Sequence, residues 1–210
     1  MDRAAGAFGF PFRRGARRAW LIGIPLLILF PLGVVPLLGY AVAVTRCAAA
    51  DPEAGPPPWR PLPRLLADGL LVALMIGVLS APFALLVAAL APALTGLLGA
   101  VADPFLRTGL AWVIAGAVAA LPWGILLLVL MPPATARFAT SGSLRDLLDL
   151  PAAVLTVRSR FPAWNLVVVA IVTAWAIGLS GLGLALIGVI PGALYALLVS
   201  AHATATLVDA

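Results

Sequence analysis

The stretch "AWLIGIPLLILFPLGVVPLLGYAVAV", residues 19–44, decides the fold, because its path fixes the membrane side on which every later segment lies. It is long and apolar enough to cross a bilayer, since about 20 residues span the hydrocarbon core. Three prolines, Pro25, Pro31 and Pro36, interrupt any single helix here. The sequence therefore allows two paths, a full crossing or a hairpin that enters the bilayer and returns.

The composition identifies the solvent of this chain as lipid. The 210 residues are 63% hydrophobic and 10% charged, whereas soluble domains carry about 25% charged residues. All 13 basic residues are arginine, and this bias, with abundant Ala, Gly and Pro, is typical of a GC-rich prokaryotic genome. The net charge of +5 predicts contact with anionic lipid headgroups and not with nucleic acid, because the chain has no separate polar domain.

Three runs without charged residues predict the spanning helices. They cover residues 69–102, 108–136 and 161–208. The first two are long enough for one helix each, and the third is long enough for two helices and a tight turn within residues 178–192. We therefore expect an all-α integral membrane protein with two transmembrane hairpins, at residues 69–136 and 161–208.

Three polar segments complete a single membrane domain. They are a basic arm at 1–18, a Pro-rich link at 46–68 and a connection at 137–160. Basic and aromatic side chains are enriched at the headgroup level of membranes. We expect membrane-surface contacts from eight such residues: Arg13, Arg14, Arg17, Arg18, Trp59, Arg145, Arg158 and Arg160.

The connection at 137–160 predicts an amphipathic helix in the plane of the interface. Its apolar residues fall on one helical face, and Ser143 with Asp146 three residues later resembles a capping box. A break in this helix is expected near Pro151. The alternative is a soluble helix packed on a partner.

Arginine counts favour the returning path for residues 19–45. A full crossing puts six arginines on one side and seven on the other, whereas a hairpin that returns puts twelve on one side and one on the other. Cytoplasmic loops carry the excess of basic residues. We therefore expect a re-entrant, proline-broken hairpin, four spanning helices, and both termini in the cytoplasm of a prokaryote, at its inner membrane. The alternatives are a fifth spanning helix and a cleaved signal, whose apolar core is normally only about 7–15 residues long.

Small residues at four-residue spacing predict close helix packing. We expect it first within the chain and second in a homo-oligomer or a larger membrane complex. The residues are Gly77, Ala81, Gly116, Ala120, Gly124, Gly188 and Gly192.

The sequence contains no enzyme motif, and we expect no catalytic residue, metal or cofactor. Cys47 is the only cysteine and His202 the only histidine. His202 is either an interfacial polar residue or an axial ligand in a haem- or pigment-bearing complex. The leading hypothesis is a non-enzymatic scaffold or accessory subunit. A carrier or channel for a neutral or lipidic substrate, with a polar lining from Ser80, Thr95, Thr173 and Ser180, is the main alternative.

Short motifs in order along the chain resemble a known family. Gly39–Tyr40 is followed by Arg46, then come Pro133–Ala134 with Arg137–Phe138, and last Leu194–Tyr195 with Ala201–His202. Over roughly residues 19–208 the chain resembles the prokaryotic membrane family called domain of unknown function 4013. The resemblance implies that His202 is a family feature, and it implies no activity.

Overall fold

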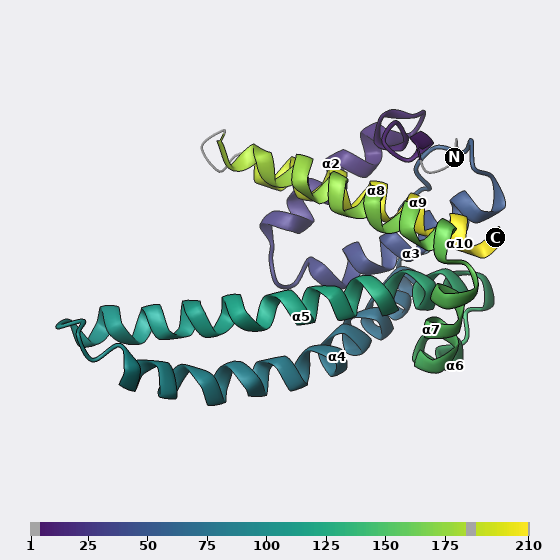
Figure 1. The fold of residues 1–210 in the computed structure, drawn as a ribbon. Coiled ribbons are helices and arrows are strands. Elements are labelled where there is room, and N and C mark those ends of the chain that lie inside the picture. The colour runs from purple at the N-terminus through teal and green to yellow at the C-terminus, as the bar shows by residue number, and fades with distance from the viewer. Residues whose placement is uncertain (1–4, 184–187, 210) are drawn as a thin grey trace. The chain divides into compact units, whose positions relative to one another are not determined.

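The computed structural model describes residues 5–183 and 188–209, and every regular element in that part of the chain is helical. An all-α membrane architecture is confirmed (Figure 1). The chain forms two compact units, unit 1 from Met1–Ala73 with Leu130–Ala210 and unit 2 from Leu74–Val129. The elements are η1 (Phe10–Phe12), α2 (Ala16–Ile28), α3 (Val34–Ala50), α4 (Leu62–Leu97), α5 (Pro104–Ser141), α6 (Leu144–Leu148), α7 (Leu150–Ser159), α8 (Phe161–Ser180), η2 (Gly181–Gly183), α9 (Val189–Thr204) and α10 (Thr206–Asp209).

Four helical segments in the described chain are long and apolar enough to cross a membrane. They are Leu62–Leu97, Pro104–Ser141, Phe161–Gly183 and Val189–Val208. Their number and order are those predicted from the charge-free runs. The turn predicted within residues 178–192 includes η2, and its residues 184–187 lie outside the described residues.

Helices α4 and α5 both extend beyond the charge-free runs that predicted them. Helix α4 begins at Leu62, inside the predicted link, because Pro63 lies in its first turn, where no intrahelical N–H bond is lost. Helix α5 continues to Ser141, since Gly142 ends it with a φ of +66° and donates its N–H to the Phe138 carbonyl at 2.8 Å.

The opening stretch forms two short helices and not one long helix. Helices α2 and α3 have 13 and 17 residues, which gives lengths of about 20 and 26 Å at 1.5 Å per residue. Both are shorter than the hydrocarbon core of about 30 Å. The chain reverses between Ile28 and Val34, where a Cβ on Gly33 would overlap the Leu26 carbonyl, so this turn requires glycine.

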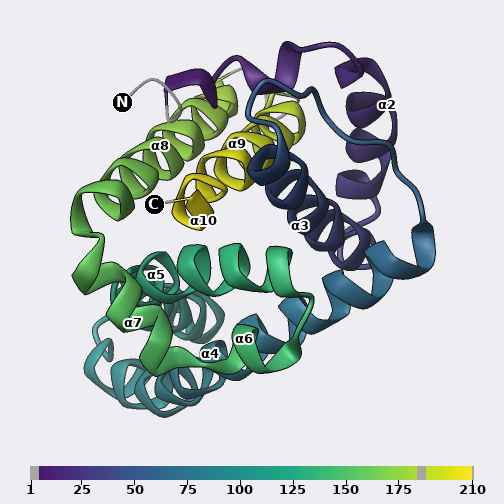
Figure 2. The same ribbon diagram turned by 90° about the vertical axis from the view of Figure 1, so that its right-hand side faces the viewer.

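Helix α9 is the centre of unit 1. Helices α8, α3 and α2 all contact it, and Figure 2 shows α9 between α8 and α3. The Thr45 hydroxyl on α3 donates to the Ala201 carbonyl on α9 at 2.9 Å, inside this packing. The core around these helices contains Phe10, Ala19, Leu37, Tyr40, Val44, Trp59, Leu65, Leu194, Leu198 and Ala201.

The connection at 137–160 contains two short helices, α6 and α7, so the break predicted near Pro151 is confirmed. The break lies at Asp149, whose Oδ1 accepts the Ala152 N–H at 3.0 Å and caps α7, with Pro151 in the first turn of α7. The capping box expected at Ser143 is wrong. Ser143 occupies the N-cap of α6, but its side chain makes no capping hydrogen bond.

The two caps differ in their expected contributions to stability. Asp149→Ala should lower the free energy of unfolding by about 1 kcal/mol, because it removes the acceptor for the Ala152 N–H. Ser143→Ala is the matched control and should change it by less than about 0.3 kcal/mol, since no capping bond is lost. Unfolding of the purified chain in mixed micelles with rising dodecyl sulfate measures both values. Equal losses in the two variants would contradict this assignment.

Candidate functional site

The two ends of the opening hairpin meet on one side of unit 1. Arg13, before α2, donates from Nη1 to the carbonyls of Pro52 at 2.5 Å and Ala54 at 3.3 Å, both after α3. Its Nη2 also lies 3.8 Å from Oε2 of Glu53. A Cβ on Gly55 would overlap the Arg14 carbonyl, so the two backbone segments are in direct contact. The hairpin is therefore closed at its base.

An aromatic pair fixes the Pro-rich segment to α3. The rings of Tyr40 and Trp59 stack with centroids 3.9 Å apart and planes 4° apart. The Tyr40 hydroxyl donates to the Pro57 carbonyl at 2.8 Å. The expected membrane-surface contact of Trp59 is wrong, because the residue is only 7% exposed and packs in the core of unit 1. The segment folds back over α3 and encloses the indole.

His202 is enclosed by the N-terminal part of the chain. Its ring lies 4.6 Å from the Phe10 ring, and its Nε2 lies 3.3 Å from the Pro52 carbonyl. The residue is 3% exposed, and its Nδ1 has no partner among the described residues. A haem axial ligand needs an open face toward the macrocycle, whereas these contacts join α9 to the base of the hairpin.

A charged cluster joins α3, α4 and α5 within unit 1. Arg46 on α3 donates from Nη2 to Oδ2 of Asp68 on α4 at 3.1 Å and from Nε to the Ala139 carbonyl on α5 at 2.7 Å. Arg64 lies 4.0 Å from the same carboxylate oxygen. The Asp68 side chain is 12% exposed and that of Arg46 is 27% exposed. The sequence motifs do not predict this pair, although both residues border apolar segments.

Two glycines bring α3 and α4 into backbone contact beside this cluster. A Cβ on Gly39 would overlap the Leu65 carbonyl, and a Cβ on Gly69 would overlap the Val35 carbonyl. Only residues without a side chain permit helices to approach so closely. The close crossing therefore explains why the Gly39–Tyr40 motif begins with glycine.

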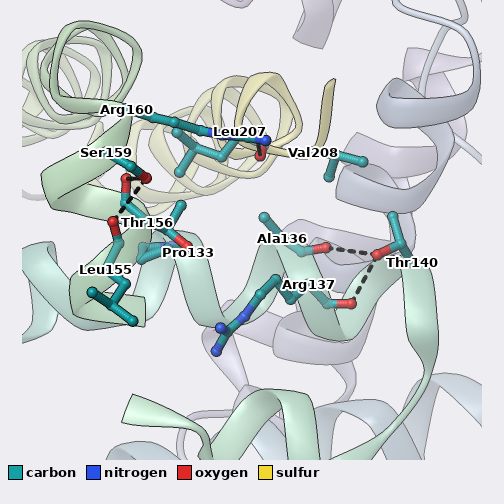
Figure 3. A pocket seen from close by; sticks show the side chains of 10 residues that line it. All are labelled: Pro133, Ala136, Arg137, Thr140, Leu155, Thr156, Ser159, Arg160, Leu207 and Val208. Carbon is teal, nitrogen blue, oxygen red and sulfur yellow. Dashed lines mark hydrogen bonds between the residues drawn. The ribbon is translucent and has the colours of Figure 1, made fainter. Parts of the chain in front are cut away.

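A polar pocket of about 350 Å³ lies where α5, α7 and α10 meet in unit 1 (Figure 3). Two arginines, three hydroxyl residues and several apolar residues line it: Pro133, Ala136, Arg137, Thr140, Leu155, Thr156, Ser159, Arg160, Leu207 and Val208. Arg137 donates from Nη2 to the carbonyls of Asp146 and Asp149 at 2.9 and 2.7 Å. Arg160 donates from Nη1 to the Leu207 carbonyl at 3.2 Å.

The other residues predicted to contact the membrane surface are mostly exposed. Arg13 is half-buried because it closes the hairpin. The remaining arginines keep exposed side chains, which a headgroup contact requires, and that contact stays a prediction. They are Arg14, Arg17, Arg18, Arg145, Arg158 and Arg160.

The predicted small-residue faces lie in two different environments. Gly188 and Gly192 on the α9 side meet the backbone of Gly181 and Gly178, where an added Cβ would collide. On α4 and α5, a Cβ added at Gly77, Gly116 or Gly124 would meet no atom of the described chain within 4 Å. Ala81 and Ala120 are exposed. In the first half of α5, the buried alanines are instead Ala111, Ala115 and Ala119.

The hydroxyls proposed to line a transport path mostly bond to their own helices. Ser80, Thr95 and Ser180 donate to the carbonyls of Ile76, Ala91 and Ile177, respectively. Ser80 also accepts the indole N–H of Trp123 at 2.9 Å, which joins α4 to α5 in unit 2. Thr173 is exposed. These contacts stabilise helices and do not favour the carrier hypothesis.

Cys47 has ordinary surroundings for a structural thiol. Burial raises the pKa of the Cys47 thiol, and the nearby Asp51 carboxylate adds to the increase. A raised pKa keeps the thiol protonated and unreactive near neutral pH. In the described part of the chain, no group of three His, Cys, Asp or Glu residues is placed to hold a metal ion.

One comparison with known proteins gives a match. A family model described as "Protein of unknown function (DUF4013)" matches residues 22–196. No curated protein matches the chain, and no solved structure does. The match covers all of unit 2 and most of unit 1, but not Arg13 or His202.

Proposed function

Because the chain belongs to the DUF4013 family of proteins of unknown function, we propose a function from its own contacts. The proposal is a non-enzymatic scaffold or accessory subunit of a membrane complex. The observation that carries it is the use of polar side chains in unit 1, where they join helices instead of facing a substrate path.

Three polar contacts illustrate this use. Thr45 ties α3 to α9, Arg46 ties α3 to α4 and α5, and Tyr40 ties α3 to the Pro-rich segment. Each contact satisfies a polar group that would be costly to leave unpaired in an apolar surrounding. Such bonds rigidify a packed unit, whereas a carrier needs polar groups that exchange partners with its substrate. This favours a structural role.

The closed hairpin supports the proposed orientation. The arm before α2 and the segment after α3 are in contact through Arg13 and Glu53, so both belong on one membrane face. His202, late in α9, meets Pro52 of the same segment, and Arg160 meets Leu207. Together with the arginine count, these contacts support both termini in the cytoplasm, with residues 19–45 re-entering from that side.

The spanning helices leave broad apolar surface for lipid and for other proteins. In the most apolar windows of Leu62–Leu97 and Pro104–Ser141, only 17% of each window is buried within the chain. Lipid-facing helices associate through van der Waals packing. These uncovered spans are suited to pack against partner helices in the bilayer.

Cross-linking in intact membranes tests the proposed function. The full chain is expressed at low level, cross-linked, extracted in mild detergent and analysed by native electrophoresis and light scattering. We expect either an oligomer of this chain or a larger complex with a defined partner. A second sample, prepared without cross-linker and dissociated in dodecyl sulfate, is the control. A monomer that captures no neighbour, or solute uptake by proteoliposomes containing this chain alone, would contradict the proposal.

A further inference from the structure

The pocket between α5, α7 and α10 is partly enclosed, and arginines from two sides contribute to its lining. Of its ten lining residues, two are arginines and none is acidic. Its volume of about 350 Å³ lies within the range of small-ligand sites, about 300–1,000 Å³. Neither Arg137 nor Arg160 forms an ion pair with a side chain of residues 5–183 or 188–208.

The two guanidinium groups retain unused donors. Arg137 bonds backbone carbonyls through Nη2 alone, and its Nε is buried without a partner among the described residues. The Asp149 carboxylate is turned to the Ala152 N–H and does not neutralise this charge. Arg160 uses one bond, to the Leu207 carbonyl. A guanidinium carries five N–H donors, so the donors that remain free can serve an acceptor in the pocket.

Three hydroxyl groups lie around the same pocket. Thr140, Thr156 and Ser159 rest against carbonyls of their own helices, at 2.9 Å from Arg137 O, 2.9 Å from Ala152 O and 2.8 Å from Leu155 O, and Figure 3 shows two of these bonds. A hydroxyl proton rotates to suit its partner, so each group can donate to a ligand. Leu155, Leu207 and Val208 supply an apolar side to the pocket.

We propose that this pocket binds a phosphate group, carried by a lipid headgroup or by a soluble phosphate compound. Guanidinium groups match phosphate oxygens in geometry and charge, and such charge-assisted bonds are about twice as strong as neutral ones. Arg137 and Arg160 are the charged ligands, and the hydroxyl of Thr156 is an additional donor. The site goes beyond the scaffold role and does not depend on it, because it needs no partner protein.

Ligand-induced thermal stabilisation of the purified full chain in neutral detergent tests this site. One arm titrates sodium phosphate against sodium chloride at matched ionic strength. The other arm titrates phosphatidylglycerol against phosphatidylcholine in mixed micelles. We expect a saturable rise in melting temperature in at least one phosphate arm, and the arm that responds identifies the source of the phosphate. Absence of a saturable rise in both arms would overturn the proposal.

Three variants localise the binding. Arg160→Gln should raise the half-saturating concentration about tenfold, since it removes a charge-assisted bond. Thr156→Val, which preserves shape, should raise it about threefold. Arg158→Gln removes the same charge two residues away, outside the pocket lining, and should stay within about twofold of the original chain. An equal loss in Arg158→Gln and Arg160→Gln would show general surface attraction and would overturn the proposal.

Discussion

Replacing Gly39 by alanine should separate α3 from α4 and lower the free energy of unfolding by about 3 kcal/mol or more. The added Cβ would overlap the Leu65 carbonyl, which belongs to the backbone of α4 and cannot turn aside as a side chain can. The helices must therefore move apart. That movement would also weaken the contact between Arg46 and Asp68, which joins the same two helices.

A matched substitution on α4 separates this collision from general effects of alanine. Gly77 has no described atom within 4 Å of an added Cβ, so Gly77→Ala should leave stability unchanged or raise it by up to about 1 kcal/mol through helix propensity. Gly69→Ala should behave like Gly39→Ala, because its Cβ would overlap the Val35 carbonyl. The measurement is unfolding in mixed micelles. Stability of Gly39→Ala equal to that of Gly77→Ala would refute the close crossing.

Replacing Asp68 by asparagine should lower the free energy of unfolding by about 2 kcal/mol. Breaking a fully buried ion pair costs about 3–5 kcal/mol, because the remaining charge is left uncompensated. The expected value is smaller here because the Arg46 side chain is 27% exposed and water screens part of its charge. Asparagine preserves the shape of the side chain, so the loss in free energy of unfolding measures the contribution of the Asp68 charge.

Glu53→Gln provides the matched control for Asp68→Asn. Glu53 faces Arg13 at 3.8 Å, but its side chain is 88% exposed, and exposed ion pairs contribute about 0–1 kcal/mol. A cycle with Arg46→Gln isolates the coupling between Arg46 and Asp68, expected at about 1–2 kcal/mol. Additive losses in the double variant would show that the two side chains do not stabilise each other.

The number of spanning helices could be predicted from the sequence, because charged residues are excluded from the bilayer core. Asp68, Asp103, Arg107 and Arg137 mark the ends of the charge-free runs, and each run became one or two spans. Helix ends were less predictable. Pro63 lies in the first turn of α4 instead of preventing a helix, and α5 continues past Arg137 to Ser141. The positions of charged residues indicate where a chain leaves the hydrocarbon core, whereas capping residues determine where a helix ends.

The contacts between helices were harder to predict, because spacing does not tell which face meets a partner. The four-residue spacing of small residues predicted a packing face at Gly116 and Ala120 on α5. The buried face lies one residue away, at Ala115 and Ala119. The spacing also missed the crossing of α3 and α4, where Gly39 and Gly69 lie far apart in the sequence. A pair formed across two helices leaves no periodic signal in either one.

The short motifs that resemble the family coincide with the contacts that hold unit 1 together. Tyr40 stacks on Trp59, Arg46 pairs with Asp68, and His202 packs on Phe10. Arg137 holds the carbonyls at the junction of α6 and α7. Contacts within unit 1 therefore explain the presence of these residues. Packing alone does not explain the polar pocket beside Arg137.

The most direct test of the account is whether both ends of the opening hairpin lie on one face of the membrane. Single cysteines are placed at Arg17, Glu53 and Ala102, all exposed positions, in a Cys47→Ser background and treated with a membrane-impermeant maleimide. Arg17→Cys and Glu53→Cys should react only after the cells are lysed, and Ala102→Cys should react in cells whose inner membrane is intact. Reaction of Arg17→Cys and Glu53→Cys from opposite sides would contradict the closed hairpin and the orientation derived from it.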